Sequence, residues 1–378
     1  MKVMIVVTHL LGTGHLRRAG TLAHAFADHG HDVRLISGGM PLDAPETAGI
    51  DLLQLPPVRS DGVNFARLLD RHGVEAGESL REARRDMLCN ALDDFIPDVL
   101  VTELYPFGRR VLAREFDALL ERAASVTPRP VVLASIRDIL APPSSPAKAE
   151  RTEHIVTSLY DAVLVHSDPQ LVSLEASWPV GPALADRLRY SGFIAPPPAS
   201  PHPDGLGQGE VLVSAGGGAV GMPLFRAALQ AARIDPDRHW RLLVGGADAN
   251  RLKELQVKAA PNTTVEPARP DFRQMLAGAA ASISLCGYNT ALDILQAGTP
   301  AVFLPFDAGN EVEQGLRAHS LARLPGIEVL KSHDLSPTAL CEMLARVIAA
   351  PKRILRQMRF DGATRSVAIA SDLLEAAR

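Results

Sequence analysis

The chain of 378 residues has few cysteines, little net charge and no long apolar run, and each shortage excludes a class of protein. Its three cysteines, Cys89, Cys286 and Cys341, form no CxxC pair, which argues against a disulfide scaffold and a thiolate zinc site. No apolar run approaches the ~18 residues that span a bilayer. The net charge of −4 gives no field that would attract a polyanion, so nucleic acid is not an expected partner. We therefore expect a soluble, cytoplasmic protein without a transmembrane segment.

The sequence does contain short apolar runs that alternate with helix-length segments. The first half has strand candidates at residues 3–8, 33–37, 52–55, 99–103, 131–135, 162–166 and 190–194. After a segment rich in proline and glycine, the pattern restarts at residues 211–214, 241–244, 263–265, 281–285 and 301–304. Nearly all-apolar strands that alternate with helices are typical of parallel sheets covered on both faces.

This pattern predicts an α/β protein with two Rossmann-like doubly wound domains that face a cleft. We expect an N-terminal domain at 1–194, a linker at 195–209 and a C-terminal domain at 210–350. The remaining residues, 351–378, are interpreted as one or two helices after a proline start. Ligands of such sheets bind beyond the carboxyl ends of the strands, so the residues that follow each strand are the candidates for a site.

A glycine turn, Gly12-Thr13-Gly14, follows the first strand and leads to His15 in the first turn of a helix. The positive end of that helix favours the neutral imidazole, which can accept a proton. A turn between strand and helix needs glycines in any case, and His15 could be a polar cap. The turn alone leaves both interpretations open.

A second glycine turn, Gly216-Gly217-Gly218, follows the strand at 211–214. A strand that runs into glycines and then a helix can hold a diphosphate on backbone N–H groups. No Lys-Ser/Thr follows, so it is not a P-loop, and no acid closes a second strand as in the nicotinamide fingerprint.

The block from Cys286 to Ala318 contains a third glycine turn and two helix starts. Asp293, on the second turn of the first helix, could accept both hydroxyls of a ribose, and Glu313 with Gln314 could do the same for a hexose. Glu311 is interpreted as a partner of the helix dipole.

These three motifs resemble those of the GT-B glycosyltransferases, in particular the branch with the UDP-N-acetylglucosamine transferase of peptidoglycan lipid synthesis. The resemblance spans most of the chain and is specific at 12–18, 216–218 and 286–318. It implies that the glycines at 216–218 hold the donor diphosphate, Asp293 the ribose, and Glu313 with Gln314 the sugar. The implied donor-binding set is Gly14, Gly216, Gly217, Gly218, Arg269, Gly287, Asn289, Thr290, Asp293, Glu313 and Gln314.

The resemblance also places Arg269 where that family reads the base with backbone groups, and it implies that the terminal helices pack back on the N-terminal domain. It implies an inverting transferase that moves a sugar from a nucleotide-diphosphate donor, expected to be UDP-linked, to a hydroxyl or amine acceptor. His15 matches the family's histidine near the reacting centre and would be the general base. Glu103 ends the strand at 99–103 and would orient His15 or replace it as base; a cap on the next helix is the alternative.

Two departures keep other functions open. The peptidoglycan enzyme has an extra glycine before its histidine, and Arg317 stands where asparagine is common. The string Gly-Thr-Gly-His-x-x-Arg is similar to that of the UDP-sugar hydrolase of pseudaminic acid synthesis. Hydrolysis that releases the free sugar therefore stays an alternative, as does a non-catalytic nucleotide-sugar-binding subunit.

Neither a metal nor another cofactor is expected beside the donor. The one Asp-x-Asp string, Asp235-Pro-Asp237, falls in a turn, and no His/Asp/Glu cluster has ligand spacing. The sequence leaves open the donor sugar and base, the acceptor, the oligomeric state and any peripheral membrane contact. It also leaves open whether Arg17, Arg18, Arg137 and Asp138 contact substrate.

Overall fold

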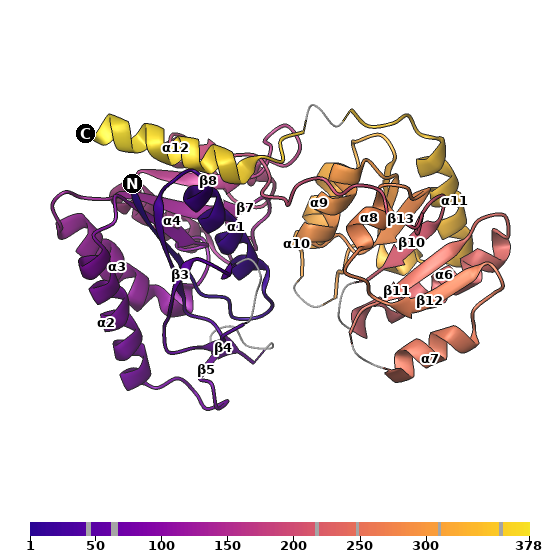
Figure 1. Cartoon of the computed structure of the whole chain (residues 1–378), viewed down its shortest axis with the longest axis horizontal. Helices are drawn as coiled ribbons and strands as arrows, with labels where there is room; N and C mark the ends of the chain where they lie inside the picture. Colours follow the sequence, from indigo (N-terminus) through magenta and orange to yellow (C-terminus); the bar gives the residue numbers. More distant parts are fainter. Residues whose placement is uncertain (43–46, 62–66, 216–218, 247–248, 309–310, 355–357) are drawn as a thin grey trace. The chain divides into compact units, whose positions relative to one another are not determined.

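The computed structural model describes residues 1–378 except 43–46, 62–66, 216–218, 247–248, 309–310 and 355–357. The chain divides into two compact units, which Figure 1 colours along the sequence. Unit 1 contains Met1–Ile194 and a returning segment, Arg359–Arg378. Unit 2 contains Ala195–Met358.

Unit 1 is built on a sheet of seven parallel strands in the part of the chain that is described. In spatial order these are β3 (Asp51–Gln54), β2 (Asp32–Ser37), β1 (Lys2–Val7), β6 (Val99–Glu103), β7 (Val131–Arg137), β8 (Ala162–His166) and β9 (Leu188–Tyr190). A separate antiparallel pair joins β4 (Arg59–Ser60) and β5 (Leu68–Leu69). Successive strands are added on one side of β1 up to β3 and on its other side from β6 onward.

Helices cover both faces of this sheet because side chains of a strand alternate between the faces. They are α1 (Gly14–Asp28), α2 (Glu78–Phe95), α3 (Ala113–Ser125), α4 (Pro146–Leu159), α5 (Pro182–Ala185) and α12 (Gly362–Ala377). Met4 and Val6 of β1 join the core under α2, α3 and α4, whereas Val3, Ile5 and Val7 join the core under α1 and α12. In Figure 1 the yellow α12 lies along unit 1, although it ends the chain.

Unit 2 repeats the design with a sheet of six parallel strands among its described residues. In spatial order these are β12 (Thr263–Pro267), β11 (Trp240–Val244), β10 (Val211–Ser214), β13 (Ala281–Ser284), β14 (Ala301–Phe303) and β15 (Ile327–Val329). Its helices are α6 (Met222–Ile234), α7 (Ala249–Val257), α8 (Phe272–Leu276), α9 (Tyr288–Ala297), α10 (Glu313–Leu321) and α11 (Pro337–Ala349). The predicted α/β class with two doubly wound parallel sheets is confirmed. No helix in the described ranges has both the length and the apolar character needed to cross a membrane.

The segment 195–209, expected to be a linker, packs on unit 2 instead. The carbonyl groups of Pro196 and Pro197 accept hydrogen bonds from Arg273 of α8. Gly209 donates its backbone N–H to the carbonyl of Gly278 at 2.9 Å. Proline lacks an N–H but keeps a carbonyl acceptor, so a proline-rich segment can still be held against a folded surface.

The helical start expected at Pro351 is also displaced. Residues 351–354 are not helical, and the buried Arg353 binds them to unit 2 through the carbonyls of Thr299, Pro325 and Gly326. The last helix begins only at Gly362, in unit 1.

The chain passes between the units twice, and within unit 1 the two passages are hydrogen-bonded to each other. Phe193 N–H donates to the carbonyl of Arg359 at 2.8 Å, and Gly362 N–H donates to the carbonyl of Phe193 at 3.0 Å. Ile194 forms an antiparallel bridge with Asp361. The strand expected at 190–194 therefore ends at Tyr190, and its last residues pair with the returning chain.

Candidate active site

Each of the two parallel sheets has one topological switch point, a pair of neighbouring strands whose connections run to opposite sides of the sheet. In unit 1 this point lies between β1 and β6, and open α/β sheets bind ligands at the carboxyl ends of such strands. His15 follows β1 in the first turn of α1, and Glu103 is the last residue of β6. The fold thus brings together two residues that lie 88 positions apart in the chain.

His15 and Glu103 form a direct hydrogen bond. The distance from His15 Nδ1 to Glu103 Oε1 is 2.8 Å, and the side chains are 15% and 2% exposed. The other carboxylate oxygen, Oε2, accepts a hydrogen bond from Ser135 Oγ at 2.6 Å. Glu103 is therefore a buried acceptor for side chains of two other elements, α1 and β7.

Arg18, one turn after His15 on α1, forms a close ion pair with Glu103 and is itself only 5% exposed. Its Nη2 lies 3.0 Å from His15 Nδ1. Nδ1 of His15 cannot accept from Arg18 and also donate to Glu103, so it forms a hydrogen bond with one of the two. The carboxylate only accepts and gives the shorter contact, 2.8 Å, which assigns the hydrogen to Nδ1 of His15. This tautomer leaves the lone pair on Nε2, the nitrogen on the far side of the ring from Glu103.

The charges around His15 hold it neutral and Glu103 ionised. Burial, together with the nearby cations Arg18 and Arg109, lowers the pKa of His15 to about 3, although Glu103 acts in the opposite sense. Burial raises the pKa of Glu103, but the Arg18 charge and the hydrogen bond from His15 outweigh it, and the net shift is downward. At neutral pH the pair is an imidazole that donates to a carboxylate.

The loop after β6 carries two residues in the left-handed region, Leu104 at φ 69° and Arg109 at φ 59°. Such conformations are costly for side chains other than glycine, and they persist where the surroundings require them. Arg109 donates from Nε to the carbonyl of Thr8 at 2.6 Å, which ties this loop to the end of β1. The contact joins the loop that follows Glu103 to the segment between β1 and α1, which leads to His15.

In unit 2 the switch point lies between β10 and β13. Gly216, Gly217 and Gly218, which follow β10, lie outside the described residues. After β13 the chain turns at Gly287 and enters α9, whose first turn contains Asn289 and Thr290. A Cβ at Gly287 would meet no described atom within 4 Å, and the same holds for Gly14 at the start of α1. Packing among the described residues of each unit does not require glycine at these two positions. A ligand that lies close to the backbone would require it.

The carboxylate of Asp293 on α9 binds an arginine that was not predicted from the sequence. Arg273 of α8 donates from Nε to Asp293 Oδ1 at 2.9 Å, and it also contacts Gln296. Burial raises the pKa of Asp293 to about 6, against the opposing effect of Arg273. A ribose at this carboxylate would share it with Arg273.

The start of α10 holds the carboxylate and amide that were expected to bind the sugar. Glu311 Oε1 accepts from the backbone N–H groups of Glu313 at 2.7 Å and Gln314 at 3.3 Å, which confirms its role at the helix start. Gln314 Oε1 accepts from the backbone N–H of Phe306 at 3.1 Å. The amide group of Gln314 is thereby anchored to the loop after β14.

Arg269 and Arg317 have partners within unit 2. Arg269 forms a fork to Asp271, with contacts of 2.8 and 2.6 Å, and is 31% exposed. Arg317 is buried and donates to the carbonyl of Cys286 at 3.0 Å, while its guanidinium lies 5.7 Å from the Tyr288 ring centroid. The arginine that departs from the family pattern thus supports the turn between β13 and α9.

Two other candidate residues, Asp235 and Asp138, accept hydrogen bonds from groups close to them in the chain. Asp235 ends α6 and accepts from Arg238 and Trp240, as expected for a turn. Asp138 is buried and accepts from the backbone N–H of Ile139 at 2.7 Å. In the described part of the chain, no three His, Cys, Asp or Glu side chains are grouped as metal ligands. Metal independence stays a prediction.

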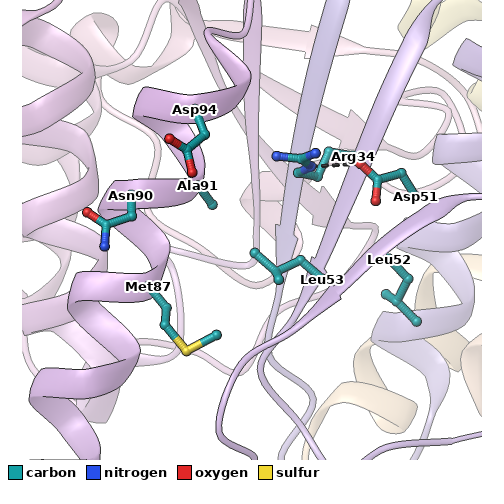
Figure 2. Close-up of a pocket in the computed structure, with 8 residues that line it drawn as sticks. All are labelled: Arg34, Asp51, Leu52, Leu53, Met87, Asn90, Ala91 and Asp94. Carbon is teal, nitrogen blue, oxygen red and sulfur yellow. Dashed lines mark hydrogen bonds and ion pairs between the residues drawn. The ribbon is translucent and has the colours of Figure 1, made fainter.

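A cavity of about 300 Å³ lies elsewhere, between α2 and the outer strands β2 and β3 of unit 1 (Figure 2). It is lined by Arg34, Asp51, Leu52, Leu53, Met87, Asn90, Ala91 and Asp94. Arg34 and Asp51 form an ion pair at 2.7 Å along its wall. None of these residues belongs to the switch point of unit 1.

Comparison with known proteins finds similarity in the second half of the chain. Residues 212–373 match the model of the glycosyltransferase family 28 C-terminal domain. A curated relative from Brucella anthropi, a UDP-N-acetylglucosamine–N-acetylmuramyl-(pentapeptide) pyrophosphoryl-undecaprenol N-acetylglucosamine transferase, is 32% identical over 149 residues. That match covers 38% of this chain and 40% of the relative, so the chain spans less than half of the relative's length.

Solved structures extend the likeness to the whole chain at the level of the fold. Acinetobacter baumannii MurG superposes with a TM-score of 0.63 at 15% identity, over 98% of this chain and 100% of that one. The calicheamicin glycosyltransferase CalG4 superposes with a TM-score of 0.58 at 19% identity, over 99% of this chain and 94% of that one. The chain therefore has the GT-B fold, as MurG and CalG4 do, and its residues 212–373 are similar to the glycosyltransferase family 28 C-terminal domain.

Proposed function

We propose that this protein is an inverting glycosyltransferase that moves a sugar from a nucleotide-diphosphate donor to a hydroxyl or amine acceptor. The observation that carries the proposal is the hydrogen bond of His15 Nδ1 to the buried Glu103, at the switch point of unit 1. It leaves Nε2 of a neutral ring to accept a proton. The match of residues 212–373 to a glycosyltransferase domain supports a donor-binding role for the second half.

In the proposed reaction, His15 Nε2 takes the proton of the acceptor hydroxyl while the acceptor oxygen attacks the anomeric carbon. The bond from that carbon to the diphosphate oxygen breaks at the same time, and the diphosphate leaves with the electron pair. A single displacement inverts the configuration of the sugar. The imidazolium that forms then faces the ionised Glu103, which stabilises it as a carboxylate does in a catalytic triad.

The donor is assigned to groups of unit 2. Asp293 accepts hydrogen bonds from the ribose, and Glu313 with Gln314 binds the sugar. The diphosphate is assigned to the backbone N–H groups at the start of α9 and to Gly216–Gly218, which lie outside the described residues. In this proposal helix dipoles rather than a cation offset its charge. UDP-N-acetylglucosamine is the first donor to test, and the lipid-linked N-acetylmuramyl-pentapeptide the first acceptor, because the name of the Brucella relative specifies both.

The test measures UDP release by His15→Ala, with and without acceptor. The variant should lose about 10²–10⁴-fold in kcat and bind the donor as before, because the base acts in the transition state. His24→Ala, on the same helix, is the matched control and should keep its activity. Normal turnover by His15→Ala would refute the assignment. Free sugar released at a catalytic rate without acceptor would instead make the protein a hydrolase.

Metal independence is tested by the same assay in EDTA. Activity should survive, since backbone dipoles are proposed to stabilise the leaving diphosphate. Complete loss in EDTA that magnesium or manganese restores would contradict this.

A further inference from the structure

On the face that α1 covers, the apolar rows of three neighbouring strands of unit 1 are each followed by a polar side chain. Side chains alternate along a strand, so Glu103 shares a face with Val99 and Val101, which join the core under α1 and α12. Ser135 of β7 is the register partner of Glu103. His166 of β8 lies two positions after Leu164, the register partner of Ser135. The apolar rows of β6, β7 and β8 thus end in Glu103, Ser135 and His166.

These polar ends are joined in one line of hydrogen bonds that continues to the residue after β9. Ser135 Oγ lies 2.6 Å from Glu103 Oε2 and 2.9 Å from His166 Nε2. His166 Nδ1 lies 2.8 Å from Ser191 Oγ. Ser135 is 1% exposed, and His166 and Ser191 are fully buried. With the contact from His15, the line has five members and reaches from α1 across three strands.

The chemistry of Glu103, Ser135 and His166 fixes the direction of the hydrogens between them. The ionised Glu103 only accepts, so the single hydroxyl hydrogen of Ser135 points to it. Ser135 Oγ must then accept from His166, which places the ring hydrogen on Nε2. Nδ1 of His166 is left as an acceptor and faces the hydroxyl of Ser191, which also lies 3.0 Å from the carbonyl oxygen of Gly192. The hydrogens of His166 and Ser135 both point toward Glu103, and such aligned donors strengthen one another.

We propose that Ser135 and His166 are positioning residues for the His15 base, an inference that rests on the proposed function of His15. Ser135 occupies Oε2 of Glu103, and His166 holds the Ser135 hydroxyl in place, which prevents the carboxylate from turning and keeps Oε1 aimed at His15 Nδ1. Arg18 contacts the same Oε1 and would compete with His15 for a carboxylate that could rotate. The line therefore holds His15 in the tautomer that presents Nε2 to the acceptor.

The activity test compares variants that differ in one contact. Ser135→Ala removes the donor to Oε2 and should lower kcat about 10–100-fold, with an unchanged KM for the donor, by analogy with the loss of hydrogen-bond partners that orient metal-binding residues. His166→Gln keeps an amide N–H near the position of Nε2 and should stay within about threefold of the parent protein. His166→Asn is shorter by one methylene, reaches only Ser191, and should lose as much as Ser135→Ala.

A second measurement reads the tautomer of His15 itself, independently of turnover. In ¹⁵N-histidine-labelled protein at neutral pH, the signals of His15 are those absent from His15→Ala. The parent protein and His166→Gln should show the hydrogen on Nδ1. Ser135→Ala and His166→Asn should show a mixture of tautomers, while circular dichroism confirms that both remain folded.

The two measurements separate the outcomes. A merely structural role of this line would lower the unfolding temperature and leave the tautomer and kcat of the folded protein unchanged, which would overturn the proposal. Normal activity of His15→Ala would overturn the proposed function, yet the tautomer of His15 would still report on Ser135 and His166. Equal losses in His166→Gln and His166→Asn would also overturn the proposal, because only one of them keeps the contact with Ser135.

Discussion

His15 is subject to two opposing effects. Its hydrogen bond to Glu103 suits a general base, whereas its other surroundings disfavour protonation of the ring. Glu103 supports the imidazolium, but burial and the cations Arg18 and Arg109 lower the pKa of His15 to about 3 in the free protein. A base is most effective when its pKa lies near the working pH. A bound diphosphate would add negative charge and raise the pKa of His15, so the donor itself would help to activate the base.

This balance predicts the pH dependence of kcat/KM, which reports groups of the free enzyme. The base works when neutral, and its pKa is lowered from 6.5 to about 3. Activity should therefore not fall through pH 6.5 as the pH is reduced from 8 to 5 on account of His15. A midpoint of loss near pH 6.5 that disappears in His15→Ala would contradict this.

The same sign governs stability at acid pH. The pKa values of His15 and His166 are each lowered from 6.5 to about 3, for His166 chiefly by burial. Below pH 6.5 the unfolded chain binds protons that the folded chain excludes, so the free energy of unfolding should fall by up to about 1.4 kcal/mol per pH unit for each histidine. Urea unfolding between pH 7.5 and 5 measures the slope. His166→Gln should have a shallower slope, and an unchanged slope would count against the burial of this ring.

Asp293 and Gln314 give a prediction that separates nucleotide from sugar. Asp293→Ala should weaken the intact donor and free UDP by a similar factor, about 1–3 kcal/mol, because the ribose hydroxyls lose their acceptor. Gln314→Ala should weaken only the intact donor. Calorimetry with both ligands gives the four affinities.

The control for Gln314 is Gln314→Glu, which keeps the oxygen that accepts from Phe306 N–H and removes the amide donor. If both variants at position 314 weaken free UDP as much as Asp293→Ala does, the start of α10 is not the sugar site.

At the scale of elements, replacing either of two helical glycines by alanine is predicted to change stability in opposite directions. A Cβ at Gly362, the first residue of α12, would lie 2.2 Å from the carbonyl oxygen of Gly192. Gly362→Ala must push α12 away from the passage at 192–194 and should lower the unfolding temperature of unit 1. Gly315 in α10 has no described neighbour within 4 Å of that position, so Gly315→Ala should stabilise unit 2 by about 0.5–1 kcal/mol. Scanning calorimetry of the whole chain tests both, and a stabilised Gly362→Ala would show that α12 can shift freely.

The elements were largely predictable from the sequence, since buried parallel strands are continuous apolar runs and glycine turns mark their ends. The short β15, Ile-Glu-Val, carries too little pattern to be recognised. The packing of 195–209 on unit 2 was not predictable either, because proline and glycine specify the shape of a segment and not its partners.

The site was predictable only where its residues stand in a local motif. His15 follows a glycine turn, and Glu103 ends a strand. For Arg18, the sequence left open whether the side chain contacts substrate and did not predict its ion pair with Glu103. Ser135, His166 and Arg273 act through contacts with residues far along the chain, and strand order, which decides such contacts, is not written in any one segment. The available signal was the position of Ser135 and His166 at the ends of their apolar rows.

At the scale of the whole molecule, each unit has a parallel sheet and a hydrophobic core of its own. Unit 2 is continuous in sequence, whereas unit 1 is completed by α12, which covers the same face of the sheet as α1. The last helix is therefore part of the fold that presents His15, although its residues 362–373 lie within the segment that matches the family 28 domain.

The pairing of the two passages makes unit 2 a cassette inserted between neighbouring points of unit 1. Ile194 and Asp361 form a bridge, so the ends left by excising residues 195–358 lie within reach of a short glycine-serine link. The chain that remains, 1–194 joined to 359–378, should fold around Trp178, its only tryptophan. Blue-shifted fluorescence of Trp178 and a cooperative melt would demonstrate this, and the same protein without 359–378 should expose the core under α12 and bind a hydrophobic dye.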